Sequence, residues 1–321
     1  MLKMAIIAGF LGKTKDRFHE YNTPLDLEGK FRSLSEIEGY DGLEIVYPYE
    51  VSDAAHVKEL MEKYGVSLAA VNVNVKGEPE FRNGGISSPD PQVRKKAVRF
   101  IKESKDFAQE VGADKVTCCP LGDGYEFSFQ VDYAEYWDNL IQSFREAGRH
   151  NPDIPLYIEY KPSETRAKCF VNDTAKTILL LNEVDAPNMG ITLDFGHSIY
   201  GNENPSEAAL LVHRSPYKLY VHINDNDARW DWDFFTGSKH MLEYIEFLYY
   251  LRKIGYSDYL TSDTSPTRWP IKDMFEINSR VTRKIWDLLD TIDTDRLEQL
   301  IHGDNFMETW KFVESNLFRL K

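Results

Sequence analysis

The sequence is poor in cysteine and in positive charge. Its three cysteines, Cys118, Cys119 and Cys169, lack Cys-x-x-Cys spacing, which argues against a disulfide framework and against a structural zinc site. We therefore expect reduced thiols in a cytoplasmic protein. Lys and Arg number 38 against 52 Asp and Glu, for a formal net charge of −14. Because such a surface repels phosphate backbones, we expect no nucleic-acid partner.

Long apolar runs and a dinucleotide-binding loop are also missing. The apolar run near the N-terminus, Met4–Phe10, is too short to span a bilayer and no signal-peptide cleavage region follows it, so we expect no membrane association. No Gly-x-Gly-x-x-Gly follows this run, which removes one reason to prefer a doubly wound sheet. Apolar residues make up 42% of the 321 residues, enough for a substantial core.

Apolar β-type runs alternate with segments of helical periodicity along the chain. The expected strands are Met4–Phe10, Gly42–Tyr47, Leu68–Val73, Asp114–Cys119, Pro155–Tyr160, Met189–Asp194, Leu219–Asn224 and Tyr259–Asp263. The expected helices are Val51–Tyr64, Gln92–Val111, Ala134–Gly148, Thr174–Val184, Pro205–Val212, His240–Ile254 and Asp273–Leu289. This alternation predicts an α/β fold, a (β/α)₈ TIM barrel. A doubly wound open sheet is the alternative.

No linker rich in Pro, Gly or Ser divides the chain. We predict a barrel over residues 1–290 and a helical C-terminal extension over residues 291–321, where apolar residues recur at helical spacing. The extension is expected to pack on the barrel or on a partner subunit, and we expect a homo-oligomer.

Acidic and histidine side chains follow the last four expected strands. Glu159, Asp194, His222 and Asp263 each stand at the end of an apolar run. In a TIM barrel these carboxyl ends meet at one face, where function resides. Charged groups there are costly unless they are compensated, and a divalent cation compensates them well. Three carboxylates and one imidazole predict a site for Mn²⁺, Mg²⁺ or Co²⁺.

A second set of ligands lies close to the first in sequence. His197 comes three residues after Asp194, and Asp231-x-Asp233 lies in the loop after the seventh strand. If Asp194 bridges, these side chains can hold a second ion, roughly 3.5–4 Å from the first. Asp225 and Asp227 compete for this role as direct ligands or loop caps.

These motifs resemble those of the xylose isomerase-like barrels. Glu159-Tyr160-Lys161-Pro162 is similar to the Glu-Pro-Lys-Pro segment of the xylose isomerases, and Asp194-x-x-His197 is similar to their Glu-x-x-His. His222 followed by Asp231-x-Asp233 resembles the rhamnose isomerases, and Asp263 matches the last carboxylate of the pattern. The resemblance covers roughly the segment from strand five to strand eight. It departs at Tyr160, where the xylose isomerases have proline.

The resemblance implies a sugar isomerase that interconverts an aldose and a ketose by a metal-assisted hydride shift. It would use two divalent ions, Mn²⁺ first, with Mg²⁺, Co²⁺ or Zn²⁺ as alternatives, and act on a monosaccharide. Lys161 would bind the carbonyl oxygen, and His197, Asp231 and Asp233 would hold the second ion or relay the proton. A plain salt bridge from Lys161 to Glu159 or Asp194 is the structural alternative.

Three other functions remain open. A ketose 3-epimerase with one metal would abstract and return a proton with Glu159 and Asp263; Asn224, Asn226 and Arg229 resemble its seventh-strand pattern. An endonuclease-like branch with three zinc ions needs histidines on strands two and three, and these strands have none. A sugar-binding barrel without catalysis would leave Lys161 unexplained.

Four further residues are expected to bind the sugar. Glu44 and Asn72 belong to strands two and three, and Arg229 and Trp230 lie in the loop after strand seven. Their carboxylate, amide, guanidinium and ring are suited to sugar hydroxyls and to an apolar wall.

Overall fold

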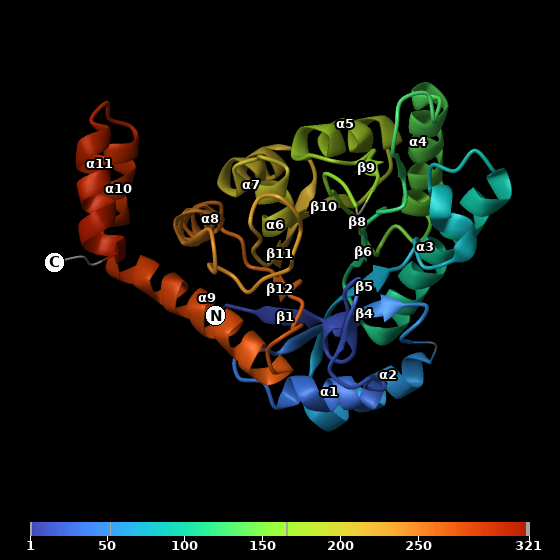
Figure 1. Ribbon diagram of the computed structural model, residues 1–321, viewed down its shortest axis with the longest axis horizontal. Coiled ribbons are helices and arrows are strands. Elements are labelled where there is room, and N and C mark those ends of the chain that lie inside the picture. Colours follow the sequence, from blue (N-terminus) through green and yellow to red (C-terminus); the bar gives the residue numbers. More distant parts are fainter. Residues whose placement is uncertain (1, 52, 165, 319–321) are drawn as a thin grey trace.

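The computed structural model describes residues 2–51, 53–164 and 166–318. Within this part, parallel strands close into a barrel, in which β1 pairs with both β4 and β12 (Figure 1). The predicted TIM barrel is confirmed, and each of the expected strands is present. The barrel strands are β1 (Met4–Ile7), β4 (Gly42–Tyr47), β5 (Ser67–Val73), β6 (Val116–Cys118), β8 (Leu156–Glu159), β10 (Met189–Asp194), β11 (Lys218–Ile223) and β12 (Leu260–Ser262).

The strands are almost continuously apolar because helices cover their outer side and side chains fill their inner side. Every residue of β1, β8, β10 and β12 is buried. Ala70, Tyr157 and Tyr220 form a small separate cluster with Tyr259 against it. Since side chains alternate along a strand, Tyr220 points the same way as His222, one layer nearer the start of β11.

The outer layer consists of helices that follow the strands (Figure 1). They are α1 (Leu27–Ser35), α2 (Ala54–Tyr64), α3 (Pro91–Val111), α4 (Tyr133–Arg149), α5 (Thr174–Val184), α6 (Phe195–Tyr200), α7 (Pro205–Arg214), α8 (Met241–Lys253) and α9 (Ile271–Thr291). The expected helices are present with small changes of their bounds. Two helices were not expected, α1 and the short α6, and α6 matters for the site.

Short strands and turns lie in the loops at the carboxyl ends of the barrel strands. The hairpin of β2 (Thr14–Lys15) and β3 (Glu20–Tyr21) follows the turn η1 (Ala8–Phe10). The turn η2 (Pro79–Asn83) follows β5, and β7 (Gly124–Tyr125) pairs with β9 (Lys168–Cys169). The loop after β6 is thereby tied to the loop after β8. None of the helices in the described ranges is long and apolar enough to cross a bilayer.

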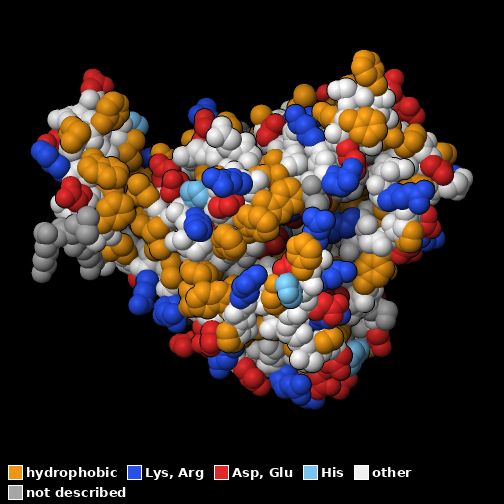
Figure 2. All heavy atoms as spheres, in the orientation of Figure 1, with side chains coloured by type: hydrophobic (Ala, Val, Ile, Leu, Met, Phe, Trp, Pro, Cys, Tyr) orange, Lys and Arg blue, Asp and Glu red, His pale blue; other side chains and the backbone are white. Residues whose placement is uncertain are grey.

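The chain continues beyond α9 with α10 (Thr294–Ile301), α11 (Phe306–Val313) and the π-helical turn η3 (Glu314–Phe318). This helical pair stands away from the strands, on the far side of α8 and α9 (Figure 1). Leu297 and Leu300 of α10 are buried, whereas α11 buries none of its residues. Apolar side chains gather on its visible face (Figure 2), and Phe306 and Met307 are among the exposed ones. The domain boundary after residue 290 stays a prediction; α9 ends next to it, at Thr291.

Candidate metal centre

The barrel brings Glu159, Asp194, His222 and Asp263 together at its mouth. Glu159 and Asp194 are the last residues of β8 and β10, and Asp263 directly follows β12. Asp194 and His222 are register partners on neighbouring strands, and the Asp263 N–H donates to the Ile223 carbonyl at 3.1 Å. One ligand atom of each side chain lies within 4.8 Å of all the others. The spacing of these donors fits one divalent cation.

The orientation of His222 supports this arrangement. Its Nε2 lies 3.1 Å from Glu44 Oε2, so Nε2–H donates to that carboxylate and Nδ1 faces the cluster. Nδ1 has no hydrogen-bond partner in the described structure although it is buried. It lies 3.4 Å from Glu159 Oε1 and 3.7 Å from Asp263 Oδ2. A buried, unpaired imidazole nitrogen facing two carboxylates is suited to a cation between them.

The position of Glu44 differs from the sugar-binding position expected from the sequence. It is fully buried, and besides His222 it accepts hydrogen bonds from Asn72 Nδ2 at 2.9 Å, Thr117 Oγ1 at 2.6 Å and Tyr220 OH at 3.0 Å. It is not among the residues that line the cavity at the barrel mouth. Its carboxylate orients the candidate ligand His222 across the barrel, from β4 to β11. Asn72 does line the cavity, as expected.

A second group of ligands shares Asp194. Asp194, His197 and Asp231 also have ligand atoms within 4.8 Å of one another. Asp194 caps α6 by accepting from the backbone N–H of His197 at 2.8 Å. A cap and the third residue after it lie on the same side of a helix start, so this short helix turns His197 toward the mouth. Asp233 lines the same cavity but is not part of this second group.

Neighbouring side chains hold this second group in place. His197 Nδ1 lies 2.8 Å from the Tyr160 carbonyl and donates to it, so Nε2 faces Asp231 Oδ2 at 3.1 Å. The Asn224 amide donates to both oxygens of Asp194, at 3.2 and 3.0 Å. A Cβ on Gly196 would lie 2.0 Å from Asn224 Oδ1, so only glycine admits this amide. Asn224 and Gly196 were not assigned these roles from the sequence.

Lys161 is paired with Asp231. Its Nζ lies 2.9 Å from Asp231 Oδ2 and 2.9 Å from Glu164 Oε2. The salt bridge proposed to Glu159 or Asp194 is thus replaced by one to the loop after β11. Asp231 Oδ1 is buried without a hydrogen-bond partner in the described structure, and it remains available as a ligand.

The carboxylates at the mouth perturb one another strongly. Burial raises the pKa of Asp194 to about 7, and the charges of Asp263, Asp231 and Glu159 add to the rise while that of His197 opposes it. Burial also raises the pKa of Asp233 far above its usual range, together with the charges of Asp231 and Asp263. So much crowded negative charge is destabilising by itself, and divalent cations relieve it.

The pKa values of His197 and Glu159 shift toward the charged forms of these side chains. Burial lowers the pKa of His197, but the charges of Asp194 and Asp231 outweigh it and raise the value to about 9. Burial likewise opposes ionisation of Glu159, yet the nearby charges of His222 and His197 hold its pKa at about 2. In the absence of an ion, the imidazoles thus supply the positive charge that a metal would bring.

The remaining expected residues lie outside the cavity at the mouth, which measures about 310 Å³. Arg229 is exposed, and the Trp230 ring packs on Tyr200 with centroids 5.6 Å apart. Asp225 anchors the loop by accepting from Lys239 N at 2.7 Å and His240 N at 3.0 Å. It is thus a loop cap and not a ligand. Among the other residues that line the cavity, Phe10, Lys76 and Cys119 were not assigned a site role from the sequence.

The comparisons with known proteins agree with this geometry. The family model described as xylose isomerase-like TIM barrel matches residues 31–285. Xylose isomerase from Thermus thermophilus is 24% identical over 190 residues, 57% of this chain and 49% of that protein. The chain therefore spans about half the length of the curated relatives it matches.

Solved structures of similar fold cover the chain more fully. An L-ribulose 3-epimerase has a TM-score of 0.73 at 16% identity and covers 95% of this chain and 99% of its own. The D-psicose 3-epimerase from Clostridium cellulolyticum H10, solved with D-tagatose, has a TM-score of 0.65 at 16% identity, with 89% and 97% covered. At this identity the likeness shows the fold alone. By the family model, the chain belongs to the xylose isomerase-like TIM barrels.

Proposed function

We propose that the protein is a divalent-metal-dependent ketose 3-epimerase. The observation that carries the proposal is the placement of two carboxylates. Of the four ligands at the mouth, Glu159 and Asp263 line the cavity, whereas Asp194 and His222 are fully buried. The pair comes from β8 and β12, on either side of β10 and β11. Two carboxyl groups that reach one sugar-sized space from different strands are suited to proton abstraction and return.

A divalent ion held by Glu159, Asp194, His222 and Asp263, Mn²⁺ in our proposal, would polarise the ketose carbonyl and the adjacent hydroxyl. Glu159, which is ionised at neutral pH, takes the proton from C3, and the electron pair of the C–H bond moves toward the carbonyl oxygen. A proton carried by Asp263, whose side chain is 17% exposed, is delivered to the opposite face of C3 while the electron pair returns from the carbonyl oxygen to C3. The configuration at C3 inverts and no other bond changes.

The comparisons support a ketose 3-epimerase more than they support the aldose–ketose isomerase expected from the sequence. Structures entitled L-ribulose 3-epimerase and D-psicose 3-epimerase cover nearly the whole chain. The xylose isomerases match it over about half of their length. We accordingly propose a monosaccharide ketose as the substrate class.

An aldose–ketose isomerase is the second candidate, because one contact favours it. Lys161 lies 2.9 Å from Asp231, beside the second ligand group. Proton transfer between two carboxylates at C3 gives this cation no role. In a hydride shift, Lys161 would stabilise the carbonyl oxygen, and Asp194, His197 and Asp231 would hold a second ion.

The hydrogen that moves during the reaction distinguishes the epimerase from the isomerase, because it exchanges with solvent in the first and stays on the sugar in the second. The Mn²⁺-loaded protein is incubated in D₂O with ketopentoses and ketohexoses, and with aldoses deuterated at C2, and products are followed by NMR. The epimerase incorporates one solvent deuterium at C3. Retention of the C2 label on C1 of a ketose product, without solvent deuterium, would replace this proposal by the isomerase. The Glu159→Gln variant, which cannot accept the proton, is the control.

A further inference from the structure

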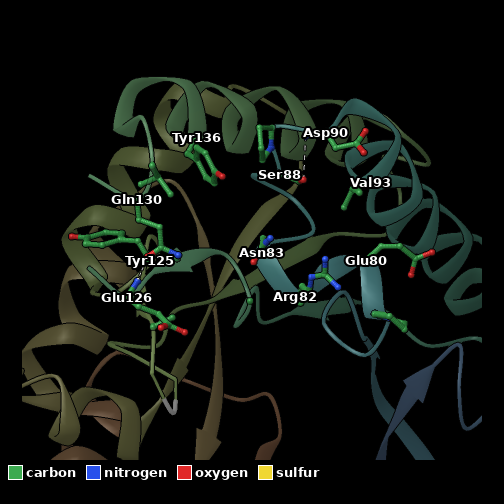
Figure 3. A pocket seen from close by; sticks show the side chains of 16 residues that line it. Glu80, Arg82, Asn83, Ser88, Asp90, Val93, Tyr125, Glu126, Gln130 and Tyr136 are labelled. Atoms are coloured by element: carbon green, nitrogen blue, oxygen red, sulfur yellow. Dashed lines mark hydrogen bonds between the residues drawn. The ribbon is translucent and has the colours of Figure 1, made fainter. Parts of the chain in front are cut away.

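A second cavity lies beside the barrel mouth. It measures about 540 Å³, against about 310 Å³ at the mouth, and is formed by the loops after β5 and β6 and the starts of α3 and α4 (Figure 3). The two cavities share a wall, because Leu121 lines the mouth and the next residue, Gly122, lines the second cavity. Its volume is in the range of small-molecule sites.

Three side chains offer unused hydrogen-bonding groups to this cavity. Arg82 and Asn83 line it from η2, and no hydrogen bond or ion pair within the described residues engages their side chains. Tyr136 faces them from α4 (Figure 3). Tyr136 is only 9% exposed, and its hydroxyl has no partner in the described structure. The hydroxyl is open to the cavity and is free to bind a ligand there.

The other walls indicate the chemistry of the ligand. Tyr125 also lines the cavity, and its ring packs against Tyr133 and Phe170. Glu80 and Glu126 line the cavity as well, but they are paired with Lys96 at 3.2 Å and with Arg166 at 2.9 Å. Asp90 caps the first turn of α3 by accepting from Gln92 N at 2.8 Å, so the helix start offers an anion no free site, and Arg82 alone among these side chains could attract one. Aromatic faces with mixed donors and acceptors suit a neutral, hydroxyl-rich ring.

We propose that this cavity, which we call the side subsite (Arg82, Asn83, Tyr125 and Tyr136), binds a neutral sugar unit. That unit is either the outer sugar of a glycoside whose inner ketose occupies the mouth, or a separate monosaccharide. The inference concerns binding next to the proposed epimerase site, and the glycoside case rests on the proposed function.

Binding is measured by saturation-transfer NMR on the full chain in chelator, which silences the metal-dependent mouth. The probes are D-fructose, lactulose (a disaccharide whose fructose unit keeps a free carbonyl form) and inorganic phosphate. A sugar should bind, and Tyr136→Phe and Arg82→Met should each weaken it by about three- to tenfold, as for one lost hydrogen bond. Tyr133→Phe removes a hydroxyl from the same helix at a residue that is 52% exposed. This control should leave binding unchanged.

Three outcomes would overturn the proposal: neither sugar binds, both variants bind as the unchanged protein does, or phosphate displaces the sugar. The Mn²⁺-loaded protein is used to distinguish the two possible ligands, a glycoside and a separate monosaccharide. Lactulose binding more tightly than fructose, with the advantage lost in Arg82→Met, identifies the outer sugar of a glycoside. Equal affinity of the two sugars identifies a separate monosaccharide. Absence of epimerisation would contradict the proposed function without changing these binding constants.

Discussion

The two halves of the barrel mouth differ in chemistry although they share one architecture. The ends of β8, β10, β11 and β12 carry the ligands Glu159, Asp194, His222 and Asp263. The ends of β1, β4, β5 and β6 offer mainly neutral groups to the cavity, among them Ile7, Val46, Asn72 and Cys119. One half therefore holds the candidate metal ligands, and the other shapes the space beside them. Glu44, on β4 in the neutral half, contacts the opposite half through His222.

The largest effect is expected where the charged half is weakened at its shared ligand. Asp194→Asn removes a ligand from both groups, and chelation should act in the same way. A metal contributes several kcal/mol to such a reaction, and about 4 kcal/mol corresponds to about 10³-fold in rate. Activity and bound metal, the latter by mass spectrometry, should therefore fall together. Asp138→Asn, on the exposed face of α4, is the control, and activity that survives chelation would contradict a metal site.

Lys161→Met tests which reaction the charged half performs. A hydride shift that depends on this cation should lose about 10²–10³-fold in kcat, the usual cost of an electrostatic stabiliser. An epimerase that depends on Glu159 and Asp263 should lose about tenfold or less, as for one charge-assisted hydrogen bond. The kinetic measurement is made at saturating Mn²⁺, so that a change in metal affinity is not mistaken for a change in catalysis.

Glu44→Gln tests the link between the halves. Loss of the carboxylate that orients His222 should weaken metal binding by about 10- to 100-fold, with little change in KM for the sugar once metal is saturating. Titration calorimetry with Mn²⁺ gives the affinity, and Glu110→Gln on the exposed side of α3 is the matched control. Unchanged metal affinity with a raised KM would return Glu44 to the sugar-binding role expected from the sequence.

The smallest effect is expected from the loop residues outside the cavity. Arg229 is exposed, so Arg229→Ala should change kcat/KM by about twofold or less, the range of surface substitutions. A larger rise in KM, measured with the best substrate of the sugar panel, would place this side chain on the sugar.

The sequence predicted the barrel well because each strand and most helices leave a local periodic signal. It also predicted the grouping of Glu159, Asp194, His222 and Asp263, since parallel strands bring their carboxyl ends to one face. The contact of Glu44 with His222 was not predictable, because it joins residues 178 positions apart and depends on how the barrel closes. The six-residue helix α6 was missed because it is too short for a periodic signal.

The role of each residue in the second ligand group remains a prediction. His197 and Asp231 are brought together with Asp194, as the sequence spacing suggested. Asp233 lines the cavity nearby, in a loop whose path is set by Asp225 and the backbone of residues 239 and 240. Loop paths of this kind follow from capping contacts that no strand or helix pattern encodes.

The placement of every candidate metal ligand at residue 159 or later has a consequence for biosynthesis. The ligands span residues 159 to 263, and the barrel closes only when β12 pairs with β1. A chain emerging from the ribosome, which proceeds from its N-terminus, holds no complete coordination set until residue 263 has appeared. We therefore expect metal loading to be a late event, and an arrested chain ending before β12 should not retain the ion.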